Sequence, residues 1–362
     1  MQTDVQPPVA LPGNLPSPAL LVFPDRIAEN IDRMIAMAGG PERLMPHVKT
    51  HKMGPVVGMQ LDKGIRRFKC ATIAEARMLA AAGAPDILLA YQLNAPMAKA
   101  FVDLQRQFPA SRFASLADNI ASARLMNDLH AAFGSKARLY IDVDNGMHRT
   151  GISPDKAADF WRGMQQLGNA DPAGLHVYDG HIRNPDLAER TRECDAAFEP
   201  VARLAADILP PEIIAGGTPT FPVHARRGTV VCSPGTCLLW DEGYGTGLPD
   251  QPFLVAAKLL TRVISKPQEG CVTLDLGHKA VSAENPITRR VFFHQLKEYE
   301  VISQSEEHLV VKTPEAATLQ VGDVLYGTPW HICPTVALYN EALVIENGNH
   351  SDTWPIARGR LI

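Results

Sequence analysis

The chain has 362 residues, of which 46% are hydrophobic and 20% are charged, a balance typical of globular proteins in water. This length suits two domains, or one barrel with an added module. The net charge of −4 argues against binding to nucleic acid or to an anionic membrane surface. No run reaches the ~20 apolar residues of a membrane span, and the N-terminus lacks the pattern of a signal peptide. We therefore expect a cytoplasmic protein whose six cysteines are free thiols.

Short apolar runs alternate with amphipathic helices through the first two thirds of the chain. A capping box at Thr72 and Glu75 marks the start of one of these helices. The repeat predicts a (β/α)₈ barrel over residues 15–247. A doubly wound sheet is the weaker alternative, because no G-x-G-x-x-G motif follows the first strand. The expected strands are 19–23, 44–49, 86–91, 112–115, 137–144, 174–178, 213–215 and 229–232, and the expected helices are 27–38, 73–82, 119–133, 154–167 and 186–208.

The pattern changes after Gly247, where short β-type runs are separated by turn residues and no clear helix intervenes. This texture predicts an all-β, barrel-like domain over residues 248–362, to which we also assign the tail 1–14. The expected strands are 253–264, 271–275, 290–293, 299–303, 308–311 and 324–326.

Two lysines and two histidines fall within six residues at 47–52, at the end of the second expected strand. A charged lysine is costly to bury, so a barrel strand that ends in Lys49 needs a reason. One reason is a Schiff base to a bound cofactor, and the alternative is a solvated basic loop.

Other polar residues also follow expected barrel strands, and catalytic side chains of barrel enzymes lie at these carboxyl ends. Two turns of small residues, 216–218 and 233–236, follow the last two strands. Backbone N–H groups and a threonine hydroxyl in such turns can bind an anion, and barrels often hold phosphate there, although each could be an ordinary turn. The candidate side chains at strand ends are Lys49, Arg149, His176, Tyr178 and His181.

The ordered set of segments 46–52, 142–151, 174–180, 216–219, 233–236 and 331–335 resembles the D-threonine aldolase and D-serine dehydratase family, whose fold is shared with alanine racemase. The resemblance covers nearly the full length. It implies pyridoxal phosphate bound to a lysine at the end of a barrel strand, a second β domain and a homodimer.

The resemblance also implies roles for individual residues. Lys49 would carry pyridoxal phosphate, with Lys52 as the alternative, and Arg149 would face the phenolic oxygen of the cofactor. Tyr178 and His176 would line the ring or the substrate, although strand alternation also allows them to be core residues. The residues that would hold the phosphate are Gly217, Thr218, Gly235 and Thr236.

His331-Ile332-Cys333 is a second constellation. In an extended segment positions i and i+2 point the same way, so an imidazole and a thiolate could meet one ion. Alone such a pair is more often accidental, but the resemblance implies a catalytic metal at the β-hydroxyl of the substrate. The soft thiolate favours Zn²⁺ over Mn²⁺ or Mg²⁺. His350 and Asp352 are a weaker second candidate.

The implied substrate is a D-β-hydroxy-α-amino acid, and we favour aldol cleavage to glycine and an aldehyde. The alternative is zinc-dependent dehydration of D-serine or D-3-hydroxyaspartate to a 2-oxo acid and ammonia. Aldolases of this family carry a histidine where this chain has Asn184, so His181 becomes the candidate base. An amino-acid racemase, with Tyr326 or Tyr339 as the second base, ranks third. A cofactor carrier without catalysis is disfavoured by the C-terminal domain.

Overall fold

The computed structural model describes residues 15–360 and divides the chain into two compact units. The barrel unit comprises residues 32–49 and 54–235, with 359 and 360. The sheet unit comprises residues 15–31, 50–53 and 236–358. The tail 1–14, which we assigned to the C-terminal domain, lies outside the described residues. In the described part of the chain, no helix combines the length and apolarity needed to cross a bilayer.

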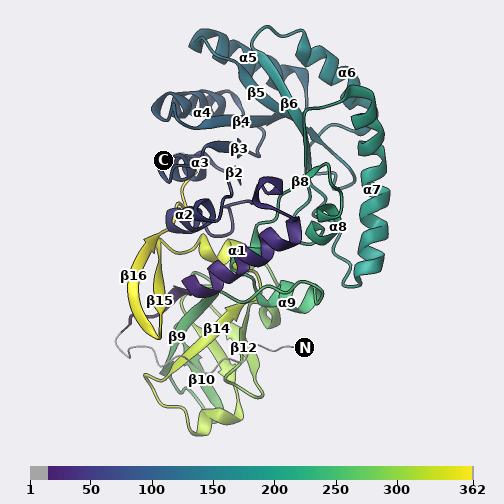
Figure 1. The fold of residues 1–362 in the computed structure, drawn as a ribbon. Coiled ribbons are helices and arrows are strands. Elements are labelled where there is room, and N and C mark those ends of the chain that lie inside the picture. Colours follow the sequence, from purple (N-terminus) through teal and green to yellow (C-terminus); the bar gives the residue numbers. More distant parts are fainter. Residues whose placement is uncertain (1–14, 361–362) are drawn as a thin grey trace. The chain divides into compact units, whose positions relative to one another are not determined.

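The barrel unit is built on a parallel sheet with the order β2-β3-β4-β5-β6-β7-β8, and helices cover its outer face (Figure 1). The strands are β2 (Arg67–Cys70), β3 (Asp86–Leu89), β4 (Arg112–Ala117), β5 (Ala137–Val143), β6 (Ala170–Val177), β7 (Ile213–Ala215) and β8 (Val230–Cys232). The helices are α2 (Gly54–Asp62), α3 (Ile73–Ala81), α4 (Ala95–Gln107), α5 (Ile120–Phe133), α6 (Pro154–Gln165), α7 (Leu187–Ile208) and α8 (Phe221–Ala225).

The segment 44–49 occupies the eighth position of the barrel. Leu44 forms a parallel bridge with Cys232 of β8, and His47 forms one with Lys69 of β2. Backbone hydrogen bonds support both sides, from Met45 N to Cys232 O at 2.9 Å and from Val48 N to Lys69 O at 2.8 Å. The predicted barrel is therefore confirmed, although this segment pairs through isolated bridges rather than as a regular strand.

Two strand assignments from the sequence were wrong. The run at 19–23 forms β1 (Ala19–Val22), which pairs with β9 and β15 of the sheet unit and not with the barrel. The barrel instead uses β2 (Arg67–Cys70), a strand that we did not predict. The predicted number of barrel positions was right only because these two errors compensate.

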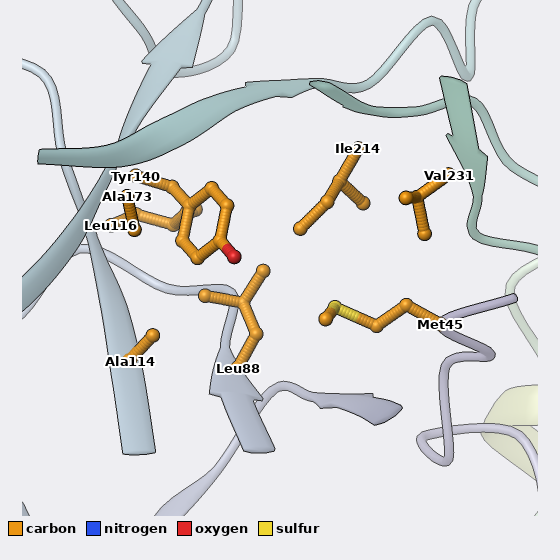
Figure 2. Close-up of a cluster of buried hydrophobic side chains, with 8 residues drawn as sticks. All are labelled: Met45, Leu88, Ala114, Leu116, Tyr140, Ala173, Ile214 and Val231. Carbon is orange, nitrogen blue, oxygen red and sulfur yellow. The ribbon is translucent and has the colours of Figure 1, made fainter. Parts of the chain in front are cut away.

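The interior of the barrel is filled by apolar side chains from successive strands (Figure 2). Met45 of the closing segment reaches this cluster, which shows that the segment is packed as part of the barrel. Successive residues of a strand point to opposite faces, so Asp142 shares the inward face of Tyr140. The cluster contains Met45, Leu88, Ala114, Leu116, Tyr140, Ala173, Ile214 and Val231.

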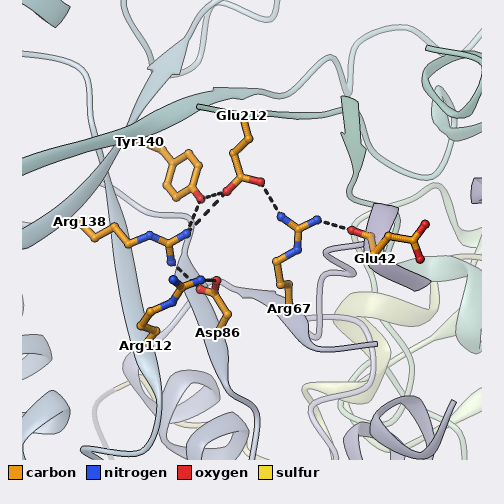
Figure 3. Close-up of polar contacts among 7 residues, drawn as sticks. All are labelled: Glu42, Arg67, Asp86, Arg112, Arg138, Tyr140 and Glu212. Atoms are coloured by element: carbon orange, nitrogen blue, oxygen red, sulfur yellow. Dashed lines mark hydrogen bonds and ion pairs between the residues drawn. The ribbon is translucent and has the colours of Figure 1, made fainter. Parts of the chain in front are cut away.

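Charged residues form a network at the amino ends of the barrel strands (Figure 3). Asp86 accepts hydrogen bonds from Arg112 and Arg138, each at 2.6 Å. Glu212 binds Arg67 at 2.5 Å and also accepts a hydrogen bond from the Tyr140 hydroxyl. Residues at this end of a barrel generally contribute to stability rather than to catalysis.

We therefore expect Asp86→Ala to lower the free energy of unfolding by about 2 kcal/mol, because it removes the shorter carboxylate contact of the largely buried Arg138 and leaves it Glu212 at 3.6 Å. Urea or thermal denaturation measures this change. The matched control is Asp103→Ala, which removes an exposed pair with Lys99 and should shift the midpoint little. Equal midpoint shifts in the two variants would contradict a stabilising role for the network.

The sheet unit contains a nine-stranded, mostly antiparallel sheet, in agreement with the β texture predicted after Gly247. Its main path runs β12-β13-β10-β9-β1-β15-β16, and β14 pairs with both β11 and β9. Its other strands are β9 (Ala257–Ser265), β10 (Cys271–Leu274), β11 (Val291–Phe293), β12 (Glu300–Gln304), β13 (Leu309–Lys312), β14 (Val324–Pro329), β15 (Glu341–Glu346) and β16 (Asn349–Pro355). It also holds helices α9 (Glu242–Gly247) and α10 (Ile332–Val336), while α1 (Pro24–Ala38) runs from this unit into the barrel unit.

Candidate active site

A cavity of about 420 Å³ lies at the carboxyl ends of the barrel strands. It brings together four of the residues predicted from the sequence: Lys49, Arg149, His176 and Tyr178. Three cationic side chains and two imidazoles outnumber the two carboxylates in its lining, which favours an anionic ligand. The remaining titratable residues around it are His47, Lys69, Tyr91, Asp142 and Asp144.

The ring of Tyr178 lies at the centre of this cationic group. Arg149 Cζ is 4.9 Å from the ring centroid, Lys49 Nζ is 5.7 Å from it and Lys69 Nζ is 5.9 Å from it. The ring also packs closely against two glycines, since a Cβ on Gly217 would lie 2.9 Å from Tyr178 Cε2 and one on Gly180 would overlap the ring. The two glycines therefore make the space that Tyr178 occupies.

His176 and Asp142 are direct partners on adjacent strands, because Asp142 of β5 pairs with His176 of β6 in the sheet register. His176 Nδ1 is 2.8 Å from Asp142 Oδ1, and His176 Nε2 is 3.3 Å from Lys69 Nζ. Burial opposes ionisation of Asp142, but the hydrogen bond and charge of His176, together with hydrogen bonds from Thr150 and Gln92, outweigh it and keep the pKa of the carboxyl low. Burial, and then the charge of Lys69, lower the pKa of His176. The pair is thus an ionised carboxylate and a neutral imidazole.

Lys69 is a site residue that the sequence reasoning missed. Its side chain is buried within β2, and burial followed by the charge of Lys49 lowers its pKa to about 7. A sequence signal was available, because Lys69 stands between Phe68 and Cys70 just before the capping box of α3. A lysine between apolar residues in a barrel strand indicates an inward-facing amine.

The two predicted phosphate turns meet in the barrel unit. Gly235 N donates to Thr218 Oγ1 at 3.2 Å, and Gly217 N donates to Thr220 Oγ1 at 3.3 Å. Gly216 has φ +80°, and a Cβ there would lie 2.7 Å from His224 Cδ2, so this position requires glycine. The residues of these turns do not line the cavity. Gly217, however, packs against Tyr178, which does line it.

A buried cluster supports these turns. Asp179, next to Tyr178, accepts a hydrogen bond from Thr220 Oγ1 at 2.7 Å and lies 2.8 Å from His224 Nε2. Cys194 Sγ is 3.5 Å from the same nitrogen. Asp179, Cys194 and His224 are close enough to share a metal ion. They already bond to one another, however, and burial raises the pKa of the Cys194 thiol, so the cluster ties the loop after β6 to the turn after β7.

Pyridoxal phosphate presents three groups that a binding site must hold: an aldehyde, an ionised phenolic oxygen and a phosphate. The cavity offers two amines for the aldehyde and a guanidinium for the phenolic oxygen. The turn at 216–218 lies against Tyr178, and its Gly217 N–H bonds to Thr220 Oγ1 at 3.3 Å, so a phosphate bound there would take over this donor. The donor set fits the cofactor.

The predicted metal pair lies in the sheet unit. His331 is the N-cap of α10 and Cys333 lies in its first turn, so the extended segment that we expected is wrong. Thr50 Oγ1 and Thr236 Oγ1 lie 3.2 and 3.4 Å from Cys333 Sγ, which places Thr236 beside this thiol. Glu284 contacts His331 Nδ1.

The electrostatics of the pair favour a thiolate and an imidazolium. Burial opposes both charges, but hydrogen bonds to Cys333 and Glu284 raise the pKa of His331 to about 9. Hydrogen bonds from His331, Thr236 and Thr50 outweigh burial and lower the pKa of Cys333. Once a metal displaces the proton of His331, the imidazole and the soft sulfur anion beside it suit Zn²⁺ better than Mn²⁺ or Mg²⁺.

The remaining candidates lie elsewhere. His181 is exposed, with Nε2 3.1 Å from the position of a Cβ on Gly146, and it is not among the cavity-lining residues. Asn184 donates to Glu193 Oε1 at 3.2 Å. His350 bonds to Thr353, Asp352 to Trp354, and the Tyr339 hydroxyl donates to Ala280 O. Tyr326 packs against the hydrophobic core of the sheet unit.

Comparisons with known proteins agree with this architecture. Residues 22–241 match the family "Alanine racemase, N-terminal domain", and residues 256–345 match the "Putative serine dehydratase domain". The chain is 28% identical to a D-threonine aldolase of Arthrobacter sp over 98% of this chain and 96% of the relative. It is 28% identical to a D-threo-3-hydroxyaspartate dehydratase of Delftia sp. over 76% and 75% of the two chains.

A solved structure also shares the fold. The crystal structure of D-threonine aldolase from Filomicrobium marinum has a TM-score of 0.88 with this chain, at 23% identity and with 97% of each chain covered. The two relatives named above are an aldolase and a dehydratase, both of which are lyases. From the match over residues 22–241, the chain belongs to the alanine racemase N-terminal domain family, and its residues 256–345 match the putative serine dehydratase domain.

Proposed function

We propose that this protein is a pyridoxal phosphate- and metal-dependent lyase that cleaves D-β-hydroxy-α-amino acids to glycine and an aldehyde. The observation that carries the proposal is the cavity in which Lys49, Arg149 and Tyr178 converge. The aldolase and dehydratase relatives support this class of reaction and this class of substrate. The proposal includes a homodimer, which the resemblance implies, and a place in the cytoplasm, which rests on the N-terminal sequence pattern.

Pyridoxal phosphate, when bound, supplies the electron sink for breaking a bond at the substrate Cα. The chain contributes the residues that hold it. Lys49 attaches the cofactor, Arg149 keeps its phenolic oxygen ionised, and Gly217, Thr218 and Gly235 receive its phosphate. Tyr178 orients the cofactor ring. Gly180 and Gly217 pack against the tyrosine ring on either side and so fix its position.

His331 and Cys333 are the proposed metal ligands, and a zinc ion there would supply a Lewis acid for the β-hydroxyl of the substrate. Asp241 positions this pair, since its Oδ2 accepts the Ile332 amide between them at 3.0 Å. The two protein ligands leave coordination positions for water or substrate, as catalytic zinc requires.

Dehydration to a 2-oxo acid and ammonia is the second candidate. Two observations favour it: Cys333 gives the pair the soft ligand that suits zinc, and a relative is a dehydratase. Asn184, hydrogen-bonded to Glu193 at the position of the aldolase histidine, removes one base from the aldolase course.

Product analysis decides between the two. With D-threonine and the protein loaded with pyridoxal phosphate and zinc, we expect glycine and acetaldehyde in equal amounts. Chromatography of derivatised amino acids, together with an aldehyde assay, measures both products. 2-Oxobutyrate and ammonia would establish the dehydratase instead. No turnover of D-threonine, D-serine or D-3-hydroxyaspartate would remove both candidates.

A further inference from the structure

Lys69 is a buried amine for which the proposed function has no use. Lys49 carries the cofactor and Arg149 faces its phenolic oxygen, yet a second lysine lines the same cavity with only 2% of its surface exposed. Lysines are almost never buried unless they are paired or functional. Its amine lies 3.3 Å from a neutral imidazole nitrogen, Nε2 of His176.

The barrel topology brings Lys69 to this imidazole. β2 and β6 are four positions apart in a barrel of eight positions, so their inward side chains face each other across the interior. Lys69 Nζ lies 3.3 Å from His176 Nε2, and His176 Nδ1 lies 2.8 Å from Asp142 Oδ1. A chain of amine, imidazole and carboxylate thus crosses the barrel.

The carboxylate at the end of this chain is held firmly. Asp142 Oδ2 accepts hydrogen bonds from Gln92 Nε2 at 2.6 Å and from Thr150 Oγ1 at 2.9 Å. Because Asp142 is ionised, the His176 ring donates from Nδ1, and its Nε2 accepts an N–H of Lys69. The lone pair of a neutral Lys69 amine is then available to a ligand in the cavity.

The charges around Lys69 set its protonation near neutral pH. Burial, Lys49 and Arg149 disfavour its ammonium form, whereas Asp142 and Asp179 favour it, and its pKa falls to about 7. His176 adds no charge, since its own pKa is lowered. An amine that titrates near the working pH can both take up and release a proton, as general acid–base catalysis requires.

We propose that Lys69 is the acid–base residue of the cleavage reaction, and that it takes the β-hydroxyl proton of the substrate, a role separate from the attachment of the cofactor to Lys49. This rests on the proposed function. The O–H bond breaks, its proton joins the Nζ lone pair, and the O–H electrons form the aldehyde C=O as Cα–Cβ breaks. The Cα–Cβ electrons stay with the two-carbon fragment, where the proton returned by Lys69 completes glycine. His176 and Asp142 position the amine.

The first test needs neither cofactor nor substrate. The cofactor-free protein is labelled with cyanate at a series of pH values, and carbamylation of each lysine is followed by peptide mass spectrometry. Only the unprotonated amine reacts, so Lys69 labelling should rise with pH around a midpoint near 7, while exposed Lys99 serves as the ordinary reference. His176→Asn should shift the Lys69 midpoint and not that of Lys99. A Lys69 midpoint equal to that of Lys99, or no Lys69 labelling where Lys49 reacts, would overturn the proposal.

The second test separates proton transfer from a structural role. Lys69→Ala should lower turnover by roughly 10²–10⁴-fold, the usual contribution of a positioned base. Added methylamine or ethylamine should restore part of the activity, with more basic amines giving higher rates. The matched control is Lys63→Ala, which removes an exposed pair with Asp32.

A further experiment separates failure of the Lys69 role from failure of the proposed lyase function. Borohydride reduction should fix the cofactor on Lys49 in both the wild type and Lys69→Ala. If the wild type fixes no cofactor on Lys49, the proposed function itself fails. If Lys69→Ala alone fails to bind cofactor, keeps full turnover, or loses turnover without rescue by amines, Lys69 is not the proton-transfer group.

Discussion

Lys49→Ala is expected to abolish both cofactor binding and turnover. The variant removes the amine that we propose attaches pyridoxal phosphate, while Arg149 and the turn at 216–218 would keep only non-covalent contacts with it. The purified variant should therefore be colourless, without the visible absorbance of lysine-bound pyridoxal phosphate, and its activity should fall below detection. Absorbance spectroscopy and product assays measure the two effects.

Lys52→Ala is the matched control, because Lys52 was the competing candidate in the same short segment. Lys52 has φ 55° and its carbonyl accepts the Ala357 amide at 2.9 Å, and it is not among the residues that line the cavity. This variant should stay yellow and active. A colourless Lys52→Ala beside a yellow Lys49→Ala would reverse the assignment.

Removal of either predicted metal ligand should cost metal and activity but leave the cofactor in place. His331→Ala and Cys333→Ala each remove one of the two proposed ligands in the sheet unit, whereas Lys49 and Arg149, the proposed cofactor residues, lie in the barrel unit. Metal analysis by mass spectrometry should find less than a tenth of the wild-type zinc content. Absorbance of the bound cofactor should be unchanged.

Cys271→Ala is the control for this pair, since Cys271 is a buried thiol of β10 in the same unit. It should keep its zinc and its turnover. If the His331 and Cys333 variants lose cofactor while their zinc content stays normal, the division between a metal pair and a cofactor cavity is wrong. Zinc retained by all three variants would instead direct attention to Asp179, Cys194 and His224.

The sequence was sufficient for the fold because the barrel repeats one strand–helix pattern. Caps mark the helices, and the capping box is present, with Glu75 N donating to Thr72 Oγ1 at 3.1 Å. Pairing partners were harder to predict, because β1 is as apolar as a barrel strand and nothing local assigns it to another sheet. β2 was missed because Arg67 and Lys69 interrupt its apolar character, although both serve the barrel.

The site was predictable where one strand end carried the signal, as at Lys49, Arg149, His176 and Tyr178. It was not predictable where the signal is a contact across the barrel. Lys69 lies 107 positions from His176, and only the closed barrel makes them neighbours. The local conformation of Cys333 also escaped prediction, because a five-residue helix, α10, leaves too weak a periodic pattern.

A comparison of three amino acids tests most directly whether the protein is a lyase for D-β-hydroxy-α-amino acids. D-threonine, L-threonine and D-alanine are each incubated with the protein loaded with pyridoxal phosphate and zinc, and all amino acids are resolved by chiral chromatography. We predict that D-threonine alone is consumed. Conversion of D-alanine to L-alanine, which needs no β-hydroxyl, or consumption of L-threonine at the same rate as D-threonine, would contradict the account.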